Sequence, residues 1–274
     1  MSTAILPLGP LPTATRFTPG ATVFLPKEHG SWSLALEPVA LGLLVAPSWA
    51  GGALAGAVLA GFFARRPFKA AFSPVPSARR LSAHETLVMW SALAVIGLFE
   101  SGVLASWTAL WPLLVALPFA ALFVWFDAQN GSRAAAAEMA GSAAFAIVPA
   151  AMATLAGWSP GAALVLGGLA LTRSVPTVLA VRSSLRRAKG EVAGFTVPVL
   201  AAGAAACGVS VLGAFRLAPV AVVLPAWGLF ARTLWLASPW RPAWPARRVG
   251  MFEAGLGLLY TIALVAAYQA GTHS

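Results

Sequence analysis

The sequence has little charge and very few acidic residues. Only 9% of its 274 residues are charged, eight are acidic, and Asp127 is the sole aspartate, so no DxxxD pair occurs. Cys207 is the single cysteine, which excludes internal disulfides and cysteine-based metal cages. With three histidines beside that one cysteine, no haem or iron–sulfur ligand set stands out. We therefore expect no cofactor and no bound metal.

Apolar residues dominate instead. The chain is 59% hydrophobic with a mean hydropathy of +0.82, an excess that is too large for a soluble core inside a solvated surface. Its eighteen Lys and Arg residues give a net charge of +10, but they lie between apolar runs. The expected partners are thus membrane lipids, and a soluble nucleic-acid binder is excluded.

The expected domain organisation is simple. Residues 1–25 contain four prolines and no apolar run long enough for a signal-peptide core, so we expect a disordered cytoplasmic tail there. Residues 26–274 are expected to form a single transmembrane helical domain.

Nine apolar runs have the length of about 20 residues that a helix needs to cross a bilayer. The sequence therefore predicts an all-α, polytopic transmembrane helix bundle of about nine spans. The predicted spans are 31–50, 52–72, 84–104, 107–126, 135–156, 160–182, 192–213, 217–237 and 249–270.

The orientation follows from the basic residues, because short cytoplasmic loops carry the excess of Lys and Arg. With nine spans and the N-terminus in the cytoplasm, seventeen of the eighteen fall at the inner ends and only Arg216 falls outside. Most acidic residues also fall at the inner ends. Any polar site is therefore predicted on the cytoplasmic side.

Charges inside the spans are more informative than loop charges, because a charge at the centre of a membrane helix costs about 2.5–3.5 kcal/mol on insertion scales. In the first span His29, Ser33 and Glu37 are four residues apart, so they form a stripe on one helix face. Either Glu37 is one buried carboxylate satisfied by a neighbouring helix, or the stripe is the polar wall of a cavity with His29 at its mouth.

The second and sixth spans carry arginines beside prolines. Arg65 and Arg66 precede Pro67, and since adjacent residues point about 100° apart, one can face the bundle while the other extends to the headgroups. Arg173 lies about two and a half turns deeper than Arg182. A guanidinium buried there needs an anion, either a ligand or a protein carboxylate.

These considerations give a set of candidate site residues. Proton-transfer candidates are His29, Glu37, Glu138 and Glu253; candidates for holding an anionic ligand are Lys27, Arg65, Arg66, Asp127, Arg133, Arg173 and Arg182.

Five stretches resemble the YwiC-like membrane protein family: PKEHGSW before the first span, ARRP in the second, FDAQNGSRAAAAEMAG at the fourth-to-fifth turn, LTRSVPTVLAVRSSLRR in the sixth and RRVGMFEAGLG opening the last. The resemblance covers residues 26–268, and PKEHGSW is its most specific part. It implies a multi-pass protein of the bacterial inner membrane and no particular reaction.

A more distant similarity is to the UbiA-like intramembrane prenyltransferases. They also look like nine-helix bundles with a cytoplasmic-side cavity, and carry aspartate-rich magnesium motifs near the inner ends of the second and sixth spans. At those two places this chain has Arg65 and Arg66 before Pro67, and Arg173 before Pro176. Paired carboxylates for magnesium are missing, so the similarity implies an anionic headgroup held directly by guanidinium groups.

Three functions remain open from the sequence. The first is binding of an anionic lipid or isoprenoid headgroup by its phosphate or carboxylate, with a metal-independent intramembrane transferase as the corresponding enzyme. The second is secondary transport of a small anion, although the usual internal repeat is only faintly present. The third is a non-catalytic membrane assembly partner that docks through its polar cytoplasmic face.

Overall fold

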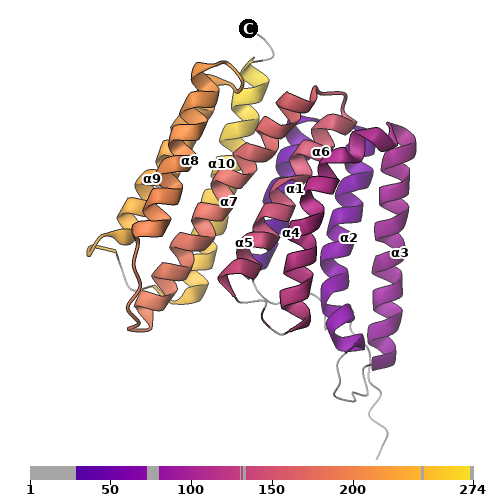
Figure 1. The fold of residues 1–274 in the computed structure, drawn as a ribbon, viewed down its shortest axis with the longest axis horizontal. Coiled ribbons are helices and arrows are strands. Elements are labelled where there is room, and N and C mark those ends of the chain that lie inside the picture. Colours follow the sequence, from indigo (N-terminus) through magenta and orange to yellow (C-terminus); the bar gives the residue numbers. More distant parts are fainter. Residues whose placement is uncertain (1–28, 73–79, 130, 132–133, 242–243, 272–274) are drawn as a thin grey trace, which may run out of the picture.

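The structure is a computed structural model that describes residues 29–72, 80–129, 131, 134–241 and 244–271. Within these ranges the regular structure is entirely helical, which confirms the predicted all-α class (Figure 1). The tail expected at residues 1–25 lies outside the described ranges, as do the candidate residues Lys27 and Arg133.

The described chain forms ten α-helices and two short 3-10 helices. They are α1 (His29–Val45), α2 (Trp49–Ala71), α3 (Arg80–Leu104), η2 (Trp107–Leu110), α4 (Trp111–Ala128), α5 (Ala135–Ala146), α6 (Val148–Leu155), α7 (Pro160–Ala188), α8 (Thr196–Ala214), η3 (Val220–Val222), α9 (Val223–Ala237) and α10 (Ala246–Gly271).

We call each helical segment that corresponds to one predicted span a passage. The described helices form nine passages, at the places predicted from the sequence. Three passages are joined from two pieces each: η2 with α4, α5 with α6, and η3 with α9. Seven passages are long and apolar enough to cross a membrane. The other two are α1, whose apolar part Trp32–Val45 is shorter, and α2, which carries three basic residues in its last two turns. The chain is a multi-pass helical membrane protein.

Local signals explain where several helices begin and end. The Ser48 hydroxyl accepts a hydrogen bond from the Gly51 N–H at 2.9 Å and so caps α2. The predicted first span ends at residue 50. Helix α1 ends five residues earlier, at Val45, because Pro47 and the Ser48 cap separate it from α2. Ser159 caps α7 in the same way, with Pro160 at the first helical position. Gly190, with φ of 80°, follows the end of α7.

Helix α7 lies at the centre of the packing. It contacts α5 and α6 on one side and the α8–α9 pair on the other, while α10 packs along α1. The α2–α3 pair lies at one side of the bundle (Figure 1). In that view α7 ends and α10 begins at the lower end of the bundle, and the C-terminus lies at the opposite end.

Close helix contacts depend on small residues. At Gly97 of α3, an added Cβ would lie 2.7 Å from the Ala53 carbonyl oxygen and 3.2 Å from the Ala57 Cβ of α2. Because these neighbours include backbone atoms that cannot move independently, α2 and α3 can lie this close only with glycine at that position.

We expect Gly97→Ala to destabilise the protein by about 1–3 kcal/mol, because overpacking forces α2 and α3 apart. The matched control is Gly208→Ala in α8, where nothing lies within 4 Å of the added Cβ and where alanine should stabilise the helix by up to about 1 kcal/mol. Unfolding of the purified variants in detergent measures both. Equal stability of the two variants would contradict the close α2–α3 contact.

Candidate functional site

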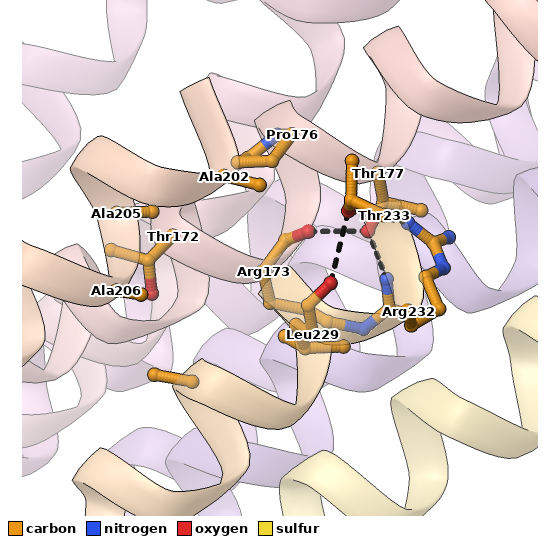
Figure 2. Close-up of a pocket in the computed structure, with 11 residues that line it drawn as sticks. Thr172, Arg173, Pro176, Thr177, Ala202, Ala205, Ala206, Leu229, Arg232 and Thr233 are labelled. Carbon is orange, nitrogen blue, oxygen red and sulfur yellow. Dashed lines mark hydrogen bonds between the residues drawn. The ribbon is translucent and has the colours of Figure 1, made fainter. Parts of the chain in front are cut away.

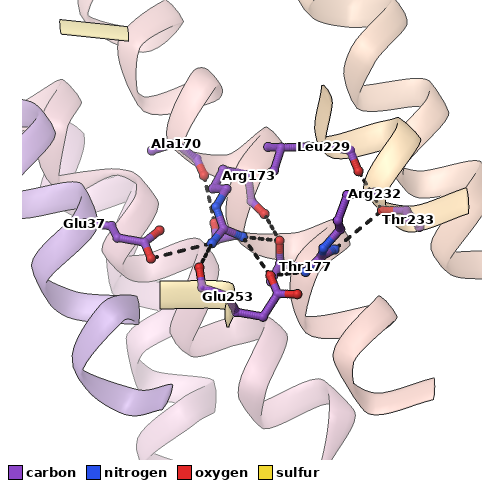
Figure 3. Close-up of polar contacts among 9 residues, drawn as sticks. Glu37, Ala170, Arg173, Thr177, Leu229, Arg232, Thr233 and Glu253 are labelled. Atoms are coloured by element: carbon purple, nitrogen blue, oxygen red, sulfur yellow. Dashed lines mark hydrogen bonds and ion pairs between the residues drawn. The ribbon is translucent and has the colours of Figure 1, made fainter. Parts of the chain in front are cut away.

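Four charged side chains from four helices meet inside the bundle. They are Glu37 of α1, Arg173 of α7, Arg232 of α9 and Glu253 of α10, called here the buried quartet (Figure 3). Arg173 Nη2 lies 3.6 Å from Glu37 Oε1, and Arg173 Nη1 lies 3.8 Å from Glu253 Oε2. Arg232 Nη2 contacts the same Glu253 oxygen. Two positive and two negative side chains thus form one chain of ion pairs.

Arg173 is held in place from several directions. Its Nη2 donates to the backbone carbonyl of Glu253 at 2.8 Å, and its Nη1 donates to the Thr177 hydroxyl one turn further along α7. Pro176 lies between Arg173 and Thr177. Because proline has no backbone N–H, the Thr172 carbonyl lacks the helical hydrogen bond that residue 176 would otherwise donate. Arg173 is 5% exposed. The quartet is therefore a buried structural element of the bundle rather than a surface ion pair.

The quartet is electrically balanced but poorly hydrogen-bonded. Among the residues that the structure describes, four of its buried polar atoms make no hydrogen bond: Glu37 Oε1, Arg173 Nε, Arg232 Nε and Glu253 Oε1. Arg232 Nη2 and Glu253 Oε2 contact each other. A buried polar group without a partner costs about 1–3 kcal/mol, and more when it is charged. Such a site has unused capacity to bind water or a ligand.

The surroundings of Glu37 follow from its two neighbours. Ser33, one turn earlier in α1, hydrogen-bonds the Glu37 carboxylate. Gly257 of α10 lies directly against that carboxylate, and a Cβ at this position would overlap it. Glycine at 257 thus lets α1 and α10 approach closely enough for Glu37 to reach Arg173.

A small cavity adjoins the two arginines of the quartet. It lies between α7, α8 and α9, and Figure 2 shows Arg173, Thr177 and Arg232 at its wall. Its polar lining is completed by Thr172 and Thr233, and alanines and Leu229 supply the apolar part. The space open to water-sized molecules is about 10 Å³, about the room for a single water.

The other candidate charges pair at the ends of the helices. Asp127 at the end of α4 accepts two hydrogen bonds from Arg65 of α2, each 3.0 Å long, and Lys69 Nζ lies 3.8 Å away. Arg182 of α7 contacts Glu138 of α5 at 2.7 Å. Arg182 is nine residues beyond Arg173, about 14 Å along the helix. These pairs are therefore separate from the quartet.

The last turn of α7 carries a further exposed pair. Arg186 Nε donates to Glu191 Oε2 at 2.8 Å, and this hydrogen bond lowers the pKa of the Glu191 carboxyl below its ordinary value. Beside it, Arg187 stacks on the Phe195 ring at 4.3 Å and donates to the Ala237 carbonyl. These contacts tie the end of α7 to the segments after α7 and α9.

The structure brings together three of the sequence-predicted site residues, Glu37, Arg173 and Glu253. Glu138 and Arg182 pair with each other, and Arg65 pairs with Asp127. Arg66 lies on α2 next to Arg65, outside the quartet. His29 begins α1, and its side chain is outside the described part of the structure. The predicted candidates thus divide into one buried site and several pairs at helix ends.

Arg232 is the site residue that sequence reasoning missed. It was counted only among the basic residues that set the orientation. Its position inside the span, five residues before the end of α9, is the same kind of signal that singled out Arg173. Thr172, Thr177 and Thr233 were missed as well, since hydroxyls are common in membrane helices and carry no spacing signal.

No metal centre is apparent in the described ranges, where no three His, Cys, Asp or Glu side chains gather closely enough to hold an ion. What the quartet offers chemically is two guanidinium groups for binding an anion and two carboxylates for accepting protons.

The fold and the site together define a multi-pass helical membrane protein with a buried, charge-balanced ion-pair site. Residues 25–153 match the family model of YwiC-like proteins, which confirms the expected resemblance over that segment, a little under half of the chain. No curated protein and no solved structure matches the chain. The family resemblance beyond residue 153 and the more distant UbiA-like similarity therefore stay predictions.

We expect Arg232→Met to destabilise the protein by about 3–5 kcal/mol, because it leaves the Glu253 carboxylate buried beside one guanidinium instead of two. Arg186→Met is the matched control: it removes an exposed pair with Glu191, so its stability should stay close to that of the wild type. Unfolding in detergent with increasing denaturant measures both. An Arg232→Met protein as stable as the control would contradict a buried ion pair at this position.

Proposed function

We propose that this membrane protein binds a small anion through the guanidinium groups of Arg173 and Arg232. The observation that carries the proposal is that both side chains are more than nine-tenths buried, line the same cavity, and have Nε–H groups without a hydrogen-bond partner in the described structure. Guanidinium N–H groups match the oxygens of carboxylate and phosphate groups. Such a ligand satisfies donors that the protein leaves unused.

The hydroxyl groups around the cavity support the same ligand chemistry. Thr172, Thr177 and Thr233 line it together with the two arginines, and hydroxyls can donate to an anion or orient a water beside it. The apolar remainder of the wall keeps the local dielectric low, which strengthens charge-assisted hydrogen bonds. The site therefore has the composition expected for recognising one compact, negatively charged group.

The cavity size favours a small anion over a lipid headgroup. The space of about 10 Å³ accommodates about one water, so any larger occupant requires the lining side chains to separate. Secondary transport of a small anion is the activity that such a site serves, since a transported ion must be bound in a site that can open to each side of the membrane in turn.

A phosphate-bearing lipid or isoprenoid headgroup offers the same chemistry and is the second candidate. It is favoured by the partial exposure of Glu37, whose side chain is 19% accessible at the edge of the quartet. A headgroup could approach along this side of α1. The two sources of the anionic group are separated by the experiment below.

We further propose that the protein lies in the bacterial cytoplasmic membrane with its N-terminus inside. This is supported by the basic residues at the end of α7 and the start of α10, which lie at the same end of the bundle, as the bias of Lys and Arg toward cytoplasmic ends requires.

The proposed site predicts stabilisation by anions. Purified wild-type protein in detergent should unfold at a higher temperature with acetate, inorganic phosphate or pyrophosphate, because a ligand present at about 100 times its Kd adds about 2.7 kcal/mol. Arg232→Lys keeps the charge but loses the planar fork, so we expect the apparent Kd to rise at least about tenfold. Arg186→Lys, on the exposed end of α7, should behave as wild type.

The probes also distinguish the ligand sources. Stabilisation by geranyl diphosphate but not by pyrophosphate would assign the site to an isoprenoid headgroup, with geraniol as the uncharged control. Stabilisation that is unchanged in Arg232→Lys would show that anions bind elsewhere. If none of these anions shifts the unfolding temperature, the proposal is wrong and a docking role becomes the better hypothesis.

A further inference from the structure

The charge balance of the quartet has a consequence for anion binding. Arg173 and Arg232 supply two positive charges, and Glu37 and Glu253 supply two negative charges, so the site is neutral as it stands. An anion bound at the two arginines makes it negative. A net charge deep in a membrane bundle is unfavourable, and uptake of one proton by a carboxylate restores neutrality.

We infer that Glu37 takes up one proton when an anion binds at Arg173 and Arg232, so that the protein binds its anion together with a proton. This inference rests on the proposed function and adds the coupling ion to it. The proton comes from hydronium or the buffer acid in the solvent, whose bond to it breaks, and the new bond is the O–H bond of the Glu37 carboxylic acid. The contact that is given up is the ion pair between Arg173 Nη2 and Glu37 Oε1 (Figure 3).

Geometry selects Glu37 over Glu253. Glu253 bridges both guanidinium groups through Oε2 and is 8% exposed at its side chain, whereas Glu37 has a single guanidinium contact at 3.6 Å and is 19% exposed. A proton therefore reaches Glu37 more easily and displaces a weaker interaction. The Ser33 hydroxyl beside Glu37 can donate to the carboxylate or accept from the carboxylic acid, so it accommodates both states.

The charged groups that face Glu37 come from two packed helices, Arg173 from α7 and Glu253 from α10. Of the other helices that contact α1, α6 has no titratable residue. Helix α2 carries Arg65, Arg66 and Lys69, of which Arg65 and Lys69 contact Asp127, and Glu138 of α5 contacts Arg182. The proton affinity of Glu37 is thus governed by the quartet, and the state of Arg173 controls it directly.

The two binding positions lie on different sides of Arg173. The cavity lies between α7, α8 and α9, while Glu37 lies on α1 at the opposite side of the Arg173 guanidinium (Figure 3). Glu37 lies eight residues from the start of α1, about 12 Å along the helix. An anion and a proton can therefore bind on different sides of the same arginine, at two distinct positions that share one residue.

Calorimetry of purified wild-type protein with acetate and with dimethyl phosphate tests the inference. Both probes keep one negative charge between about pH 6 and pH 8, so any proton uptake belongs to the protein. Titrations in buffers of different ionisation enthalpy should report about one proton taken up per anion. Once Glu37 is ionised in the unliganded protein, the anion affinity should fall about tenfold per pH unit.

Three variants identify the residue. Glu37→Gln should reduce proton uptake to near zero, make the affinity independent of pH, and bind acetate at least as tightly as wild type near pH 8, because the glutamine mimics the protonated acid. This gain of affinity cannot arise from misfolding. Glu85→Gln, an exposed position on α3, should keep the full uptake. Glu253→Gln also leaves the quartet with one surplus positive charge, so it should bind the anion with little proton uptake.

The possible failures are distinct. Anion binding without proton uptake, or unchanged uptake in Glu37→Gln, overturns the coupling and leaves the proposed anion site intact. Loss of uptake in Glu253→Gln but not in Glu37→Gln overturns the assignment to Glu37. Absence of any anion binding to wild-type protein overturns the proposed function and this inference with it.

Discussion

The interaction on which this structure depends is the pairing of the buried Arg173 guanidinium. Arg173 lies near the middle of α7, the helix that contacts both sides of the bundle, and its charge has to be compensated within the membrane. Compensation comes from α1 through Glu37 and from α10 through both the backbone and the side chain of Glu253. Helices α1, α7 and α10 are thereby tied together at one point.

This pairing also explains why the segment that matches the YwiC-like family cannot form the site alone. That segment ends at residue 153 and contributes only Glu37, while both arginines and Glu253 come from α7, α9 and α10. A Glu37 carboxylate without Arg173 would be buried without a counter-charge, which is strongly unfavourable. The N-terminal and C-terminal parts of the chain therefore complete one another.

The sequence predicted the passages better than the site, for a physical reason. Apolar runs of membrane length report directly on crossing, so all nine places were found, and only ends such as that of α1, set by the Ser48 cap, were displaced. Spacing along a helix shows which residues share a face, as with Ser33 and Glu37. It does not show how two helices are rotated against each other, so the pairing of Arg65 with Asp127 and of Glu253 with Arg232 could not be foreseen.

Buried ion pairs are not an economical way to stabilise a bundle. Hydrophobic side chains of similar volume often stabilise as well or better, and four atoms of this quartet lack hydrogen bonds within the described structure. The quartet combines four charges with unused hydrogen-bonding capacity and lies beside a cavity. Its Glu37 carboxylate lies against Gly257, where any larger residue would overlap it. This arrangement is more than packing requires. Stability alone does not account for this arrangement, whereas the proposed exchange of an internal carboxylate for an external anion would.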